Sequence, residues 1–384
     1  MSDRARLIIL FCSTMLMTLS FIGLRMDVPL LALKLGASPF LIGVLMSAFA
    51  ILPVFLAVHA GRWIDAVGIV GPMIASAGAM AACLVLVSAL PSLWILFLVN
   101  AITGIGSIAF HLALTAATGA IGRPEDRTAN FSWITVANGV GIFAGPVITG
   151  HLVDAIGHSL ALAALAIPPA LVACFIGTLR SIRQARPRRA SHSVLRGIRE
   201  LIALPELVRI LIIAAVLGVG WDLYALLVPI YGSSIGLQAG MIGNVMGAFG
   251  VSVFVVRLLV PFMLRFMSEW QIVVTALFMC APVFMLIPLA TGPGILMLLT
   301  FTFGIAWGAV QPILTSLLYG ASPGGRIGEV SGVRMTLHTA LQLVMPTLFG
   351  TLSVMAGMIP VFWSVGGVLL VSGWLVRGRW RARR

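Results

Sequence analysis

Charged residues are scarce in this chain: 9% of its 384 residues are Asp, Glu, Lys or Arg, whereas 60% are hydrophobic. A water-soluble domain cannot hide that much apolar surface, so the composition excludes a soluble globular protein and predicts one dissolved in a lipid bilayer. Acidic residues are the scarcer charge, with 11 against 24 basic ones, and the formal net charge is +13. Such an excess of positive charge is also typical of proteins that bind nucleic acid, but the distribution of the basic residues along the chain argues against that partner.

Cysteines and enzyme motifs are scarce as well. The four cysteines stand alone in separate apolar segments, so their spacing predicts neither a metal site nor a disulfide framework (Cys12, Cys83, Cys174 and Cys280). No Gly-x-x-x-x-Gly-Lys-Ser/Thr loop and no His-Glu-x-x-His pair occurs, which argues against ATP hydrolysis and zinc-dependent hydrolysis. We therefore expect a protein that is not an enzyme and that uses no cofactor or metal.

Long apolar runs fill most of the chain. A helix that spans a bilayer needs about 20 predominantly apolar residues. Runs of that kind occur near residues 7–33, 39–60, 69–90, 93–119, 129–153, 159–179, 208–232, 239–262, 270–291, 294–319, 328–354 and 359–376. The sequence thus predicts an all-α membrane protein of twelve transmembrane helices, arranged as two pseudo-symmetric six-helix bundles. The bundles comprise residues 1–179 and 207–384, and the Arg-rich polar segment 180–206 is the linker between them.

The second half repeats the first at an ungapped offset of 200 residues, so that Val28-Pro29 recurs as Val228-Pro229. Glycines and prolines are the informative matches, because they mark helix breaks and close helix contacts. The matched pairs are Gly36 and Gly236, Gly43 and Gly243, Gly104 and Gly304, Pro146 and Pro346, Gly150 and Gly350, and Gly157 and Gly357. In membrane proteins, two similar halves indicate a binding site between them and an alternating motion about it.

Basic residues gather on one side of the predicted membrane. With the N-terminus in the cytoplasm, every one except Arg25 and Lys34 falls on the cytoplasmic side, in the middle loop and at both ends of the chain. This positive-inside pattern places both termini in the cytoplasm, here of a bacterial inner membrane. The Arg clusters are interpreted as topology signals and contacts to anionic lipids, with no nucleic-acid partner.

Two local patterns resemble the major facilitator superfamily. Residues 61–68 read GRWIDAVG, and Gly61, Asp65 and Gly68 match the superfamily's inner-loop signature, with Arg62 as an added charge. The cations that usually follow this signature are absent here. An acid at the end of one helix can pair with basic groups or with a nearby helix N-terminus, which locks the inner gate.

The second pattern lies in the predicted fifth span, ANGVGIFAGPVITG. Its Gly141, Gly145, Pro146 and Gly150 resemble the pattern of family members that export substrate in exchange for protons. Glycines on one face allow close helix approach, and proline bends the helix, so tight packing alone accounts for the same residues equally well. A third family pattern fails, because Asn100 stands where proton-driven exporters usually carry Arg in the fourth span.

The superfamily resemblance implies that spans 1, 4, 7 and 10 surround a central cavity, flanked by 2, 5, 8 and 11. An ionisable residue inside a spanning helix is costly, which makes it a functional candidate. Asp222, beside Trp221 and Tyr224, is the first candidate for a proton carrier. The alternative is a buried acid that a neighbouring helix satisfies. Arg25 and Asp27 are two residues apart and therefore point to different faces, and Asp27 either caps the outer helix end or binds across to the seventh span.

A polar stripe runs along the predicted eleventh span. Arg334, His338 and Gln342 follow an i, i+4, i+8 spacing, and His338 lies about 15 Å into the membrane. Histidine titrates near neutral pH, so His338 is a candidate for proton transfer or substrate binding, with a hydrogen-bonded packing role as the alternative. The candidates for lining the cavity include Asn138, which is the repeat counterpart of His338. The others are Arg25, His111, Trp221, Tyr224, Trp307, Gln311, Arg334 and Gln342.

These observations predict a monomeric secondary transporter that rocks its two halves about a central site. We expect proton-coupled export of a small, mostly apolar molecule such as a drug or metabolite, with Asp222, His338 and Asp27 as proton-coupling candidates. A proton-driven uptake symporter or a uniporter of the same fold is the first alternative. A membrane scaffold or sensor that transports nothing is the second.

Overall fold

The computed structural model describes residues 3–123, 126–177, 204–322 and 327–380, and every regular element within them is helical. The helices of the first half are α1 (Asp3–Lys34), α2 (Pro39–Val67), α3 (Val70–Ala89), α4 (Leu93–Ala120), α5 (Arg127–Leu165) and α6 (Ile167–Ile176). Those of the second half are α8 (Pro205–Ser234), α9 (Ala239–Phe266), α10 (Glu269–Leu286), α11 (Pro293–Ala321), α12 (Ile327–Ala356) and α13 (Met358–Val376). Short 3-10 turns, η3 (Ile287–Leu289) and η4 (Arg377–Trp380), follow α10 and α13.

Within the described ranges, eleven helical stretches are long and apolar enough to cross a membrane, so the predicted count of twelve is not confirmed. The difference lies in Ala129–Ile176, which counts as one stretch although the sequence predicts two spans there. Gly157 interrupts this stretch with φ 78° and ψ 166°, a non-helical conformation that glycine adopts without a steric penalty. The predicted boundary between the fifth and sixth spans therefore falls at a kink inside α5.

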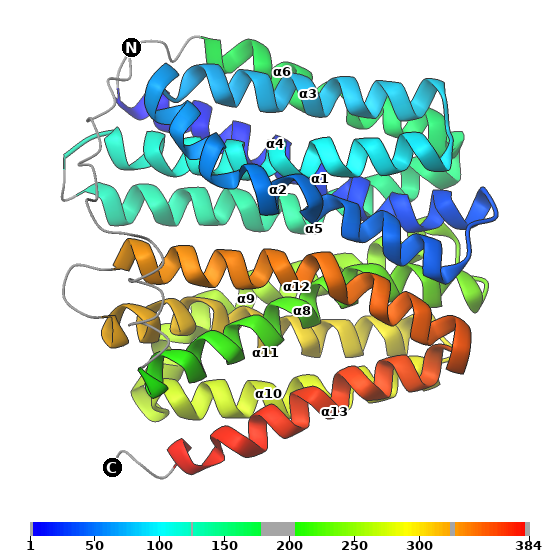
Figure 1. Ribbon diagram of the computed structural model, residues 1–384, viewed down its shortest axis with the longest axis vertical. Helices are drawn as coiled ribbons and strands as arrows, with labels where there is room; N and C mark the ends of the chain where they lie inside the picture. The colour runs from blue at the N-terminus through cyan, green and yellow to red at the C-terminus, as the bar shows by residue number, and fades with distance from the viewer. Residues whose placement is uncertain (1–2, 124–125, 178–203, 323–326, 381–384) are drawn as a thin grey trace.

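Figure 1 draws α1 to α6 in the upper part of the molecule and α8 to α13 in the lower part. The end of the molecule that holds Asp3 and Arg377, on the left of the figure, is called the terminal end below. The other end, which holds the turns 35–38 and 235–238, is called the opposite end. The helices run between the two ends, as expected for spans that cross the same bilayer.

The two halves meet most closely where α2 packs on α12 and where α5 packs on α9. Gly43 lies against the Pro346 carbonyl, and Gly243 lies against the Pro146 carbonyl, so that a Cβ at either glycine would collide with backbone. Each of these contacts is the other shifted by 200 residues. The repeated glycines and prolines of the sequence thus form matched crossings between the halves, near the opposite end.

The glycines of the predicted exporter pattern are also packing positions. Gly141 and Gly145 lie where α5 crosses α1, and a Cβ there would meet Thr18 and the Leu19 carbonyl, respectively. Gly150, one turn after Pro146, faces the start of α9. Close helix approach therefore accounts for this pattern in the structure.

The inner-loop signature is described only in part. α2 continues through residues 61–65, but the side chains of Arg62 and Asp65 lie outside the described part of the structure, as does the environment of Gly61. Gly68 ends the helix with φ 90° and donates its N–H to the Ile64 carbonyl. Of the predicted linker, residues 180–203 also lie outside what the structure describes.

Candidate functional site

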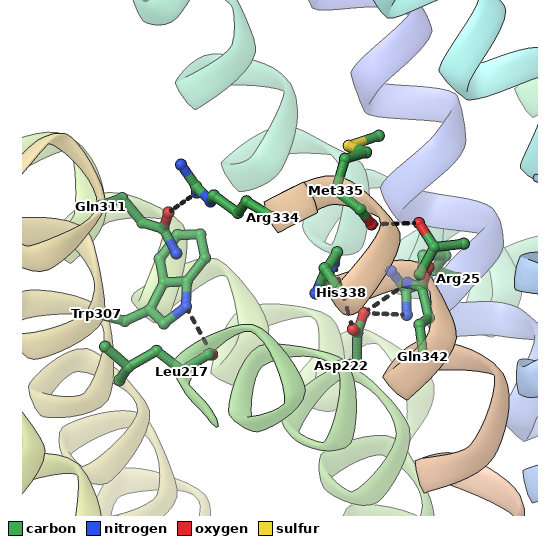
Figure 2. Close-up of polar contacts among 10 residues, drawn as sticks. Arg25, Leu217, Asp222, Trp307, Gln311, Arg334, Met335, His338 and Gln342 are labelled. Carbon is green, nitrogen blue, oxygen red and sulfur yellow. Dashed lines mark hydrogen bonds and ion pairs between the residues drawn. The ribbon is translucent and has the colours of Figure 1, made fainter. Parts of the chain in front are cut away.

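The centre of the molecule holds a buried ion pair between the two halves. Arg25 on α1 places its guanidinium nitrogen 3.0 Å from Oδ1 of Asp222 on α8 (Figure 2). The two side chains are 9% and 2% exposed, so the pair is almost fully removed from solvent. The guanidinium also lies 5.4 Å from the ring centroid of Phe49, in a cation–π arrangement.

Two residues of α12 complete the surroundings of Asp222. Gln342 donates an amide hydrogen bond to Oδ1 at 2.9 Å, and His338 Nε2 lies 3.7 Å from Oδ2. Residues four apart share one helix face, which is why this spacing brings both side chains to the same carboxylate. Oδ2 is buried and accepts no hydrogen bond from any described residue. One carboxylate oxygen is therefore engaged by Arg25 and Gln342, whereas the other has the ionisable side chain of His338 beside it and forms no hydrogen bond with a described residue.

His338 occupies the space that a glycine of α8 leaves open. A Cβ at Gly218 would lie 2.6 Å from Nδ1 of the imidazole ring, whereas a Cβ at Gly220 would meet nothing within 4 Å. His338 is also 33% exposed at its side chain, against 2% for Asp222. The imidazole thus stands between the buried carboxylate and more accessible space.

The third member of the predicted stripe, Arg334, turns away from Asp222. Its guanidinium donates a hydrogen bond to Gln311 at 3.2 Å (Figure 2). It donates a second one to Thr315, also on α11, at 3.3 Å. Arg334 and Gln311 therefore connect α12 to α11, nearer the terminal end than the Asp222 cluster. The stripe divides into two separate interactions.

A cavity of about 210 Å³ lies between α1, α3, α4, α5, α8 and α11. Two tryptophans, Trp221 and Trp307, form the part of its wall that comes from the second half. Its polar lining consists of Thr18, Ser76, Thr103, Ser107, His111 and Asn138. None of its lining residues is Asp, Glu, Lys or Arg, so the cavity suits a neutral, mostly apolar molecule.

Four of the predicted cavity residues line this space: His111, Asn138, Trp221 and Trp307. Asn138 accepts a hydrogen bond from Thr18 at 3.0 Å, which orients its amide across the α1–α5 contact. The predicted cavity residues Arg25, Gln311, Arg334 and Gln342 lie outside the cavity lining and form the polar interactions described above.

Tyr224 is also absent from the lining, because it lies behind Trp221. Its ring is fully buried, 5.7 Å from that of Trp221 between centroids. Trp221 in turn stacks on Phe249 at 4.7 Å and approaches Trp307 at 5.2 Å. The Trp307 indole donates a hydrogen bond to the Leu217 carbonyl at 3.2 Å, which fixes its ring at the cavity wall (Figure 2).

Asp27 lies outside this cluster, and the contacts that the sequence predicts for its side chain are wrong. Neither predicted arrangement, a helix cap or a bond across to α8, describes its contact. Its Oδ1 instead lies 2.6 Å from Nδ1 of His158, just past the Gly157 kink. Arg25 forms the bond to α8 in its place, because residues two apart on α1 point in different directions.

Polar contacts also join the halves at the opposite end. The Gly240 N–H in the first turn of α9 donates to Asp154 Oδ2 at 2.7 Å, and His151 Nε2 lies 3.2 Å from Asn244 Oδ1. A carboxylate at a helix N-terminus is favoured by the exposed N–H groups and by the helix dipole. A second, mainly polar cavity of about 540 Å³ lies beside these contacts and includes Lys34, Asp154, His158 and Ser233 in its wall.

Sequence reasoning missed His158, Thr18 and Gly218 as members of these sites. Thr18 and Gly218 look like ordinary small packing residues, and only the three-dimensional contact gives them a role. A signal for His158 existed: it is a histidine beside a repeated glycine at a predicted helix boundary, at the same membrane level as an unpaired acid in α1. That signal becomes specific only when α1 and α5 are known to be neighbours.

A family model described as Major Facilitator Superfamily matches residues 10–346 of the chain. Among solved structures, a mutant form of the nucleoside transporter NupG is similar with a TM-score of 0.82 at 14% identity, over 98% of this chain and 100% of that one. A POT family transporter in complex with a thioalcohol-conjugated peptide has a TM-score of 0.81 at 14% identity, over 97% and 95% of the two chains. No curated protein matches the chain in sequence. At these identities the structural likeness shows a shared fold.

Proposed function

The chain belongs to the Major Facilitator Superfamily, and from that premise we propose that it exports a small, mostly apolar molecule across the membrane in exchange for protons. The observation that carries this proposal is the buried Arg25–Asp222 pair, which links α1 to α8 and leaves Oδ2 of the carboxylate without a hydrogen-bond donor among the described residues. A buried acid with one unengaged oxygen, beside a histidine and near an uncharged cavity, has the parts that proton-coupled transport requires.

Protonation of Asp222 weakens the link between the halves. A proton on Oδ2 removes the negative charge that Arg25 pairs with, while Gln342 can still donate to Oδ1. Removing one partner of a buried ion pair costs about 3–5 kcal/mol, because the other charge stays buried without compensation. A difference of about 5.5 kcal/mol moves a two-state equilibrium from 1:99 to 99:1. The free-energy cost of leaving Arg25 without its counter-charge approaches this difference, so protonation of Oδ2 is sufficient to bias the conformation of the transporter.

His338 supplies the path for that proton. Its Nε2 lies 3.7 Å from Oδ2 and its side chain is partly exposed, so small ring movements bring it into hydrogen-bond range of the carboxylate. An imidazole changes its charge in the physiological pH range, which suits repeated loading and release. Substrate in the Trp221–Trp307 cavity would favour the deprotonated, ion-paired form of the site. Binding of substrate and of a proton would then be mutually exclusive, which is the requirement for exchange.

The described conformation is closed at the opposite end by the contacts of α2 with α12 and of α5 with α9. Gly43 against Pro346, Gly243 against Pro146 and the Asp154–Gly240 hydrogen bond all lie in the parts of these helices near that end. Alternating access would separate these contacts and close the terminal end instead.

The finer organisation follows the same proposal. We assign twelve spans to two six-helix bundles, residues 1–179 and 207–384, joined by the linker 180–206. The protein would act as a monomer in a bacterial inner membrane, with both termini cytoplasmic and the Arg clusters in contact with anionic lipid. Its partners are then a small-molecule substrate, protons and lipid, with no nucleic acid.

The test is transport by purified protein in liposomes that contain a pH-sensitive dye, with a substrate first identified by thermal-shift screening of drugs and metabolites. Exchange predicts that protons move opposite to the substrate, whereas movement in the same direction would establish a symporter.

Asp222→Asn should abolish coupled flux in a folded protein. Asp3→Asn is the matched control, because the side chain of Asp3 is 57% exposed and pairs with Arg6 of the same helix. Undiminished coupled flux in Asp222→Asn would contradict the proposal. If the protein transports none of the screened compounds but binds another protein, that result would favour the scaffold alternative.

A further inference from the structure

A second carboxylate, Asp27, is buried in α1, two residues after Arg25 but with a different partner. Asp27 is 0% exposed and lies seven residues before the end of α1 at Lys34, which is about 10 Å along the helix. Its Oδ1 is 2.6 Å from His158 Nδ1, and its Oδ2 is buried without a hydrogen-bond partner among the described residues. A carboxylate with half of its hydrogen-bonding capacity unused is costly in such a place. No described group other than His158 therefore forms a hydrogen bond that offsets the cost of a charge on this carboxylate, and protonation would remove that charge.

His158 separates this carboxylate from the polar cavity at the opposite end. The cavity wall includes His158, Lys34, Asp154 and Ser233 but does not include Asp27. The His158 side chain is 13% exposed, while that of Asp27 is 0% exposed. The helix break at Gly157 turns the chain at this point, and His158 is the next residue along it. The imidazole therefore has the buried acid at its Nδ1 atom and forms part of the cavity wall.

This arrangement is chemically complete for passing a proton. A hydronium ion in the cavity gives a proton to Nε2 of neutral His158, which leaves water and forms an imidazolium. Nδ1–H then donates its proton to Oδ1 of Asp27, which leaves a neutral carboxyl and a neutral imidazole of the other tautomer. The reverse sequence releases the proton to the cavity, so atoms and charge balance in both directions.

We propose that His158 relays protons between the cavity at the opposite end and Asp27, and that Asp27 is a second proton site besides Asp222. The inference rests on the proposed proton coupling for its role in transport. Asp27 and Arg25 are two residues apart on α1, so a proton on Asp27 removes a negative charge close to the cation that Asp222 binds. The two proton sites are thereby coupled through one short segment of α1.

The charges around the pair are few. On α1, Lys34 lies in the same cavity wall and favours the carboxylate, and Arg25 is the next cation toward the centre. On α5, Asp154 and His151 are engaged by Gly240 and Asn244 of α9. From α8 and α9 the cavity wall receives only uncharged residues: Ser233, Leu237, Ala239 and Ile242, of which Leu237 lies in the turn between these helices. His158 is thus the titratable group in direct contact with Asp27.

The relay is tested on purified protein in lipid by infrared spectroscopy, which needs no substrate. The carboxyl stretch of protonated Asp27, assigned with Asp27→Asn, shifts when its proton exchanges for deuterium. His158→Gln keeps an amide donor for Asp27 but cannot titrate, and it should slow this exchange by at least about tenfold. His151→Gln, seven residues earlier in the same helix, is the control and should leave the exchange rate unchanged.

An equal exchange rate in His158→Gln and in the unmodified protein would overturn the relay. So would the absence of any Asp27 carboxyl band between about pH 5 and 8, the range in which histidine changes charge. Transport then separates the two proposals. If Asp222→Asn abolishes coupled flux while His158→Gln leaves both flux and its pH profile unchanged, the relay is wrong and the proposed function stands. If exchange slows in His158→Gln but no substrate moves protons, the relay stands and the proposed function fails.

Discussion

Arg25 and Asp222 are 197 residues apart in the chain, yet their charged groups lie 3.0 Å apart in the buried centre of the protein. Because Arg25 belongs to α1 and Asp222 to α8, the pair joins the two sequence repeats. The repeat itself does not predict the pair, since position 225 is Ala and position 22 is Ile. The helical scaffold is therefore repeated, whereas the charges at its centre are unique.

Replacing Arg25 by Gln should destabilise the protein by about 3–5 kcal/mol, because the Asp222 carboxylate would remain buried without its cation. The double variant with Asp222→Asn should recover most of this loss, since neither charge is then present. Chemical unfolding of the protein in detergent measures both effects. If the two single effects simply add in the double variant, the residues do not act as a pair.

Gly218→Ala should displace His338 from its position beside Asp222, because the new methyl group would lie 2.6 Å from the imidazole Nδ1. Gly220→Ala is the control two residues away, where a Cβ meets nothing within 4 Å. We expect Gly218→Ala to reduce proton-coupled transport by at least about tenfold, since a well-positioned acid–base group contributes about 10²–10⁴-fold to the rate of proton transfer. Gly220→Ala should leave transport intact and stabilise the helix by about 0.5–1 kcal/mol.

Equal transport by Gly218→Ala and Gly220→Ala would show that the position of His338 does not matter for coupling. The nuclear magnetic resonance signal of the His338 ring in the two variants would then confirm whether the ring had moved at all.

Gly43→Ala should hold the opposite end open, because the added Cβ would collide with the Pro346 carbonyl where α2 crosses α12. Gly78→Ala in α3 is the control, since a Cβ there meets no neighbouring atom within 4 Å. Spin labels on the turns 35–38 and 235–238 should report a longer mean distance in Gly43→Ala than in Gly78→Ala. Identical distance distributions would exclude this crossing as part of the closed state.

The cavity should prefer neutral aromatic ligands over anionic ones of similar shape, because its wall contains two indole rings and no Asp, Glu, Lys or Arg. Trp307→Leu should weaken the binding of such a ligand by about 1–3 kcal/mol, because the contact with the indole ring is lost. Titration of the compound found by thermal-shift screening measures the affinity. Stronger binding of a carboxylate analogue would indicate that Arg25 or Arg334 reaches the substrate instead.

Much of the scaffold could be predicted from the sequence, because helix length, apolar runs and repeated glycines are local or periodic signals. Gly43 and Pro346 illustrate this: their repeat partners Gly243 and Pro146 make the same contact. The convergence of His338 and Gln342 also follows from their i, i+4 spacing. That they converge on Asp222 does not follow from the spacing, because spacing defines a helix face but not the neighbouring helix that this face contacts.

The pairing of Asp27 shows the same limit. Its position two residues after Arg25 predicts that the two side chains diverge, and they do. Which helix each one reaches depends on how α1 packs against α5 and α8. The sequence accordingly predicts no partner for His158 and places Arg334 in one stripe with His338 and Gln342. The structure pairs His158 with Asp27 and Arg334 with Gln311.

The central claim, that Asp222 exchanges its proton for substrate, is tested most directly by counting protons when substrate binds. The measurement adds the identified substrate to purified protein in weakly buffered detergent solution and follows pH, with Asp222→Asn and Asp3→Asn in parallel. If substrate in the cavity favours the deprotonated form of Asp222, the unmodified protein and Asp3→Asn should release protons on binding, in an amount that falls as the starting pH rises. Asp222→Asn should then bind substrate without releasing any. Equal proton release by Asp222→Asn, or none by the unmodified protein at any pH, would contradict the claim.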